Sequence, residues 1–127
     1  MELKKIAAIY SIIIGLAMIG MWLSLIITNQ VPEINSEQIR ISYHLIGEFL
    51  TAILLMIGGF WLFTNRGWGF HVFLISMGML LYTVIVSAGY YGQKGDMIMV
   101  VMFTIFQVLT VLFIGLSFYK WKEFKAK

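Results

Sequence analysis

The sequence contains no cysteine and a single proline, and only 12% of its 127 residues are charged. The absence of cysteine excludes disulfides, thiolate metal sites, iron–sulfur clusters and cysteine nucleophiles. A soluble globular domain carries about 25% charged residues. The scarcity of charge therefore places the chain in a lipid bilayer.

Apolar residues, in contrast, make up 61% of the chain. A membrane-spanning helix needs about 20 mostly apolar residues, and four stretches reach that length, at about residues 6–28, 43–64, 69–91 and 97–119. The segments between them contain the Pro, Gly, Asn and Asp residues that are typical of turns. The sequence predicts an all-α fold, a polytopic membrane protein with one domain over residues 1–127 and four transmembrane helices in an antiparallel bundle.

Basic residues are divided unevenly between the two ends of the predicted helices. Arg40 and Lys94 flank one end, and the other basic residues flank the opposite end: Lys4, Lys5, Arg66, Lys120, Lys122, Lys125 and Lys127. Because cytoplasmic loops carry the excess of Lys and Arg, we expect both termini in the cytoplasm of a cell-membrane protein. The same placement explains the net charge of +3 without a nucleic-acid partner.

The longest connection, residues 29–42, precedes the second predicted span. Ser36 followed by Glu37 has the pattern of a helix N-cap with an acidic first turn. We therefore expect the second helix to begin at this point, outside the bilayer.

Small residues are expected to mark the helix contacts. Lipid tails are as apolar as leucine, so helices in a membrane associate through close backbone approach and interhelical hydrogen bonds. The small residues predicted to lie at interfaces are Ala17, Gly20, Ser24, Gly47, Thr51, Gly58, Gly59, Gly78, Gly89 and Gly115.

Polar residues gather toward the helix ends that we place outside the cell. His44, Glu48 and Thr51 are spaced i, i+4 and i+7, so they share one face of the second helix. The third and fourth helices add polar residues at a similar depth: Tyr82, Thr83, Ser87, Tyr90 and Gln107. We predict that these residues line an outward-facing pocket between the second, third and fourth helices.

Glu48 is the most informative of these residues. An ionised carboxylate that faces lipid costs about 2.5–3.5 kcal/mol at mid-membrane, which makes intramembrane acids functional candidates. We expect Glu48 to face the interior, either ionised, with His44 as a charged partner and Tyr82 or Tyr90 as hydroxyl donors, or neutral because burial disfavours its charged form. The alternative is a carboxyl group that is hydrogen-bonded in the bundle and has no further role. His44 and Glu48 are also spaced to hold one metal ion, although zinc sites use three or four ligands.

The function follows from the pocket rather than from a catalytic motif, because the sequence has no HExxH, GxSxG, P-loop or CxxC pattern. We predict a non-enzymatic protein that binds a small molecule, an ion or a lipid headgroup, as a subunit, a regulator or an oligomeric transporter. Its expected partners are the bilayer and a further copy or another membrane protein. One alternative is a haem-, metal- or quinone-binding redox protein or enzyme that uses His44 and Glu48. The other is a purely structural assembly partner, and the sequence assigns no cofactor.

Overall fold

The computed structural model describes residues 2–125, and every element in them is a helix. The helices are α1 (Leu3–Ile27), α2 (Glu33–Ser36), α3 (Gln38–Phe63), α4 (Gly69–Gln93), α5 (Met97–Tyr119) and α6 (Trp121–Phe124). The helices α1, α3, α4 and α5 are long and apolar enough to cross a membrane. The prediction of an all-α chain with four such helices is confirmed, and the chain is compatible with a multi-pass membrane protein. Lys127, one of the basic residues counted above, lies outside the described residues.

The helix boundaries differ from the predicted spans mainly at the start of α3, which begins at Gln38. The expected N-cap is wrong, because Ser36 is the last residue of α2 and its hydroxyl donates to the carbonyl of Pro32 at 3.3 Å. Pro32 precedes the separate helical turn of α2, and Ser36 closes it. Glu37 then stands before α3, where its carboxylate accepts from Arg40 at 3.1 Å.

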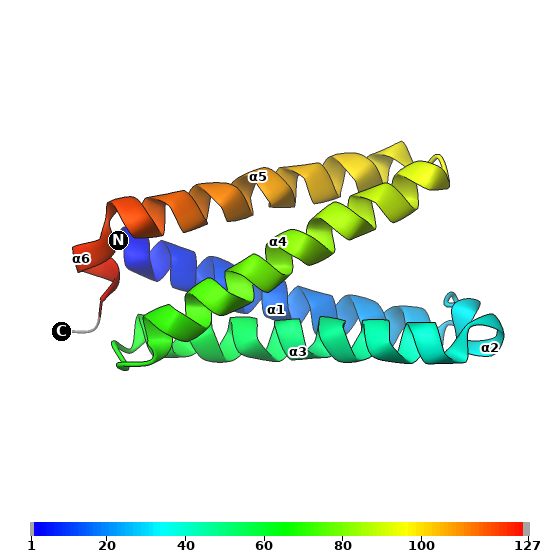
Figure 1. Cartoon of the computed structure of the whole chain (residues 1–127), viewed down its shortest axis with the longest axis horizontal. Helices are drawn as coiled ribbons and strands as arrows, with labels where there is room; N and C mark the ends of the chain where they lie inside the picture. Colours follow the sequence, from blue (N-terminus) through cyan, green and yellow to red (C-terminus); the bar gives the residue numbers. More distant parts are fainter. Residues whose placement is uncertain (1, 126–127) are drawn as a thin grey trace.

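Each long helix packs against the next one in the chain: α1 along α3, α3 along α4, and α4 along α5 (Figure 1). The short helix α2 lies at one end of the molecule, and α6 lies at the other end beside the start of α1 (Figure 1). At the α6 end, the backbone N–H of Lys4 donates to Glu123 at 3.1 Å, and the Lys4 ammonium donates to Asn65. These contacts tie three separate segments of the chain together.

Glycines allow α1 and α3 to approach closely. A Cβ atom at Gly15 would lie 2.7 Å from a backbone carbonyl oxygen of α3, and one at Gly59 would lie 2.7 Å from a carbonyl oxygen of α1. Between them, the hydroxyl of Ser11 donates to the carbonyl of Leu55 at 2.6 Å. Close backbone approach and an interhelical hydrogen bond are the interactions that hold helices together in lipid.

The prediction of interfacial small residues holds for Thr51, Gly58 and Gly59, which are buried, and is wrong for the others. Ala17 and Ser24 are exposed. Within the described residues, a Cβ atom would meet nothing within 4 Å at five predicted positions: Gly20, Gly47, Gly78, Gly89 and Gly115. The reason is that apolar side chains cover both the buried and the exposed faces of the long helices, so small residues alone do not identify the packing face.

The last long helix, α5, is the least buried of the four. In its most apolar stretch of 18 residues, 11% of the residues are buried, against 28–39% in the other long helices. It contacts α1 where the hydroxyl of Tyr10 lies 3.0 Å from that of Thr110 and the Tyr10 ring packs on Phe113 at 4.8 Å. Toward the α2 end, α5 and α1 diverge (Figure 1). The residues that line a cavity at this end include Leu25 of α1 and Phe103 of α5.

Candidate functional site

Glu48 is buried in α3, with 5% of its surface exposed. The indole Nε1 of Trp22 on α1 donates to Oε2 of Glu48 at 3.3 Å. The imidazole Nε2 of His44 lies 3.6 Å from Oε1, and the rings of His44 and Trp22 meet in a T-shaped arrangement with their centroids 5.5 Å apart. The carboxylate thus has one partner on its own helix and one on α1, as expected for a charged group that avoids lipid.

The expectation that tyrosine hydroxyls donate to Glu48 is wrong. The hydroxyl of Tyr90 donates to Glu33 at 2.9 Å instead, and Tyr82 is 71% exposed on the surface of α4. The donor comes from α1, because α1 packs along the face of α3 that carries Glu48. Trp22 was missed in the sequence because an indole inside an apolar run looks like any other large apolar side chain.

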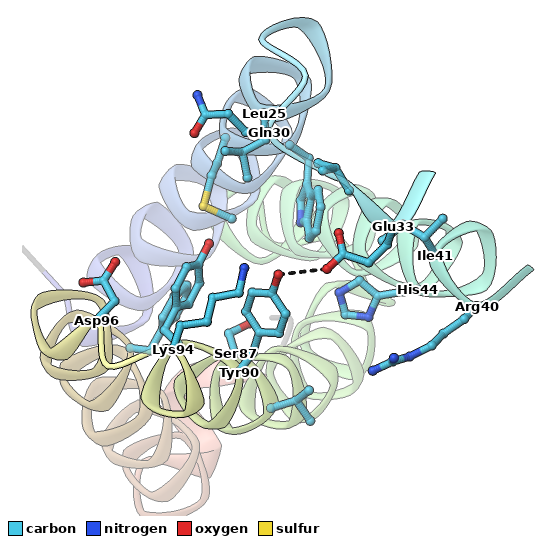
Figure 2. Close-up of a pocket in the computed structure, with 16 residues that line it drawn as sticks. Leu25, Gln30, Glu33, Arg40, Ile41, His44, Ser87, Tyr90, Lys94 and Asp96 are labelled. Atoms are coloured by element: carbon cyan, nitrogen blue, oxygen red, sulfur yellow. Dashed lines mark hydrogen bonds between the residues drawn. The ribbon is translucent and has the colours of Figure 1, made fainter. Parts of the chain in front are cut away.

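A cavity of about 660 Å³, which we call the large cavity, opens at the α2 end (Figure 2). Residues of α1, α3, α4, α5 and the two connections at this end line it: Met21, Trp22, Leu25, Gln30, Val31, Glu33, Arg40, Ile41, His44, Val86, Ser87, Tyr90, Tyr91, Lys94, Asp96 and Phe103. Its volume is that of a typical ligand pocket, at about 300–1,000 Å³. Charged side chains ring its mouth and apolar side chains form its walls.

The mouth of the large cavity holds a cluster of interacting charges. Tyr90 donates to Glu33 across the opening, and the ammonium of Lys94 lies 4.3 Å from the centre of the Tyr90 ring (Figure 2). The pKa of Glu33 lies below its ordinary value, because its own backbone N–H, the Tyr90 hydroxyl, Lys94 and Arg40 all favour the carboxylate. The Tyr90 hydroxyl and the negative charge of Glu33 raise the pKa of Lys94. These groups connect α2, α4 and the α4–α5 connection.

A second opening of about 370 Å³, which we call the side groove, lies between α3 and α4. It is lined by Tyr43, His44, Gly47, Glu48, Thr51, Met79, Tyr82, Thr83 and Val86. His44 and Val86 also line the large cavity. These two side chains therefore stand between the two openings.

The predicted site residues are divided between the two openings rather than gathered in one pocket. Glu48, Thr51, Tyr82 and Thr83 line the side groove. Ser87 and Tyr90 line the large cavity, and His44 lines both. Gln107 is half-buried on α5 and lines neither.

Sequence reasoning missed several lining residues of the large cavity. Glu33 and Lys94 were read as parts of loops, and the first helix was not expected to contribute. A signal was present, because Glu33 and Lys94 are charged residues on two connections at the same end of the molecule.

The metal prediction stays a prediction. Among residues 2–125, no group of three or more His, Cys, Asp or Glu side chains is placed to hold a metal ion. His44 and Glu48 together would supply two ligands, whereas structural and catalytic zinc sites take at least three from the protein. What this pair offers directly is a carboxylate beside an imidazole, which can bind a cation or exchange a proton.

Comparison with known proteins identifies the family. The chain belongs to the family described as domain of unknown function DUF8058, whose model matches residues 1–127. No curated protein and no solved structure matches the chain. The match covers the whole chain and assigns no ligand to the two openings.

Proposed function

We propose that this member of the DUF8058 family is a non-enzymatic cell-membrane protein that binds an amphiphilic small molecule, a lipid with a phosphate headgroup, in the large cavity. The observation that carries the proposal is that apolar and charged side chains line different parts of the cavity. Apolar side chains from α1 and α5, such as Met21, Leu25 and Phe103, form the walls, while Glu33 and Lys94 stand at the mouth. An amphiphile has the same division, with an apolar body and a charged head.

The proposed topology puts this mouth on the outer side of the membrane. The four long helices form an antiparallel bundle with both termini in the cytoplasm. The support is the distribution of basic residues, since only Arg40 and Lys94 lie near the α2 end and the rest of the described basic residues lie near the α6 end. A lipid of the outer leaflet would then have its head at the level of Lys94.

The chemistry of the mouth suits a phosphate-bearing head. Lys94 is exposed, and its ammonium can pair with a phosphate oxygen. Glu33 and Asp96 line the same mouth and can pair with an amine on the same headgroup. Tyr90 lies between Glu33 and Lys94 and can donate to the phosphate when its bond to Glu33 opens.

A role as a binding subunit or regulator is favoured over transport by a single copy. The serine hydroxyls buried nearer the α6 end donate hydrogen bonds to backbone carbonyls: Ser11 to Leu55, Ser76 to Phe73 and Ser117 to Ile114. Because these hydroxyls are already bonded to the backbone, they offer no polar path toward the cytoplasm. The ligand is therefore proposed to enter and leave by the α2 end.

Native mass spectrometry of the detergent-purified protein tests the proposal. We expect a mass excess that matches a phospholipid, reduced by Lys94→Gln, which removes the cation, and by Ser87→Trp, which fills the cavity. Lys122→Gln is the matched control, since it removes an exposed lysine near the α6 end. A protein that retains no lipid, or equal retention in all four proteins, would contradict the proposal.

A further inference from the structure

We infer that the side groove is a second binding site, one that takes an organic cation dissolved in the membrane and uses Glu48 as its counter-charge. This site goes beyond the proposed function, because it lies between α3 and α4 and opens on the flank of the molecule rather than at the α2 end. The ligand class is a lipophilic amine or quaternary cation. Its apolar body stays in contact with lipid while its charge meets the carboxylate.

The groove lies within the membrane-spanning part of the helices. Glu48 stands about 15 Å along α3 from Gln38, at a rise of about 1.5 Å per residue. Tyr43 and Tyr82 flank the groove and are 73% and 71% exposed. A molecule in the bilayer can therefore reach the groove from the side, without passing through the large cavity.

The carboxylate of Glu48 has acceptor capacity to spare. A carboxylate offers about four lone-pair positions. Within the described residues, Trp22 donates to Oε2 at 3.3 Å and His44 lies 3.6 Å from Oε1. The remaining positions carry charge in a low-dielectric place, where an added cation interacts strongly. A cation in the groove would thus relieve the cost of burying this charge.

The lining selects an organic cation over other ligands. Among the described residues that form the groove there is no Lys or Arg, so it does not suit an anion. Metal ions need more ligands than His44 and Glu48 provide. The rings of Tyr43 and Tyr82, together with Met79, instead offer the aromatic and apolar surfaces that bind organic cations.

Gly47 keeps the groove open beside the carboxylate. A Cβ atom at this position would meet nothing within 4 Å among the described residues, so no close helix contact explains the glycine. The carbonyl of Gly47 accepts from the hydroxyl of Thr51 at 2.7 Å, which turns that hydroxyl toward its own helix. The space above Gly47 is therefore left for a ligand.

Binding of tetraphenylphosphonium to the full chain in phosphatidylcholine nanodiscs, measured by equilibrium dialysis, tests this inference. Tetraphenylborate, an anion of the same shape, is the comparator. We expect saturable binding of the cation above the uptake by empty nanodiscs, and no binding of the anion above the same background. Glu48→Gln should weaken cation binding about tenfold or more, because the charge pair is lost from a desolvated place. Glu37→Gln, which removes an exposed carboxylate outside both openings, should leave binding unchanged.

Gly47→Leu is a second variant that does not depend on the charge. Its Cβ would meet nothing within 4 Å among the described residues, and the rest of the side chain is expected to occupy the groove. Cation binding should be abolished while the protein stays folded, so this variant tests the inference even if Glu48→Gln does not fold. Retained cation binding in Gly47→Leu or Glu48→Gln, equal binding of the anion, or binding of only a neutral quinone such as decylubiquinone would overturn the inference. Lipid retention in the large cavity is read separately, by mass, so the two sites succeed or fail independently.

Discussion

The indole nitrogen of Trp22 and the carboxylate of Glu48 form a hydrogen bond of 3.3 Å that joins α1 to α3. Through this bond, a residue of α1 stabilises the carboxylate of Glu48 inside the proposed membrane region. His44, one of the two side chains between the large cavity and the side groove, contacts both partners of this bond, Trp22 and Glu48.

Replacement of Trp22 by Phe should destabilise the protein by about 1–2 kcal/mol, because it removes the donor and leaves a buried carboxylate with fewer partners. Thermal unfolding in detergent, followed by circular dichroism, measures the effect. Trp68→Phe is the matched control, since Trp68 is 74% exposed. In a Glu48→Gln background the Trp22 substitution should cost less, and an equal cost in both backgrounds would show that the hydrogen bond contributes little.

Two glycines of α1 provide a paired test of the helix interface. Gly15→Ala should cost about 1–3 kcal/mol, because its Cβ would lie 2.7 Å from a carbonyl oxygen of α3 and force the helices apart. Gly20→Ala should be neutral or stabilise the helix by up to about 1 kcal/mol, since its Cβ meets nothing within 4 Å in the described part of the chain. Unfolding temperatures in the same detergent compare them, and a similar loss in both variants would contradict the packing of α1 on α3.

These glycines also show which parts of the fold can be predicted from the sequence and which cannot. The four long helices could be found because each is an apolar run of sufficient length. The packing face of α1 could not, because lipid and protein are equally apolar partners and hydropathy does not distinguish them. Gly15 and Gly20 look alike in the sequence, and only the first faces α3.

The candidate site was predicted in part for a similar reason. The shared face of His44 and Glu48 follows from helical spacing alone, and the structure keeps the two side chains 3.6 Å apart. Their neighbour Trp22 depends on how α1 rotates against α3, which helical spacing within one element does not fix. The same holds for the bond between Tyr90 and Glu33, which joins segments 57 residues apart.

The cluster at the mouth of the large cavity should make stability depend on pH. The pKa of Glu33 is lowered in the folded protein from an ordinary 4.5, so its contribution is present above about 4.5 and is lost as the pH falls through the lower folded value. Because the pair is exposed, the effect should be about 0.2–1 kcal/mol. We therefore expect the unfolding temperature to fall as the pH drops below about 4.5. Glu33→Gln should remove this part of the fall, and Tyr90→Phe should make it smaller. Tyr119→Phe, at the other end of the molecule, should leave it unchanged. The same fall in Glu33→Gln as in the parent protein would contradict a contribution of Glu33 to stability.

The proposed topology can be tested with single thiols, since the chain has no cysteine of its own. Gln93→Cys near the α2 end should react with a membrane-impermeant maleimide on intact cells. Lys122→Cys near the α6 end should react only after the cells are permeabilised. Both side chains are exposed, so the contrast measures sidedness, and the reverse pattern would place the termini outside.

The order in which the helices pack has a consequence for biosynthesis. Each long helix rests mainly on the long helix made before it, so the main interfaces can form in the order of synthesis, as each segment leaves the insertion machinery. The contacts of Tyr10 with Thr110 and of Lys4 with Glu123 join the first helix to the last ones. They can form only when α5 and α6 have been made. A nascent chain stalled before α5 would therefore hold α1, α3 and α4 together but lack the contacts that join α1 to α5 and α6.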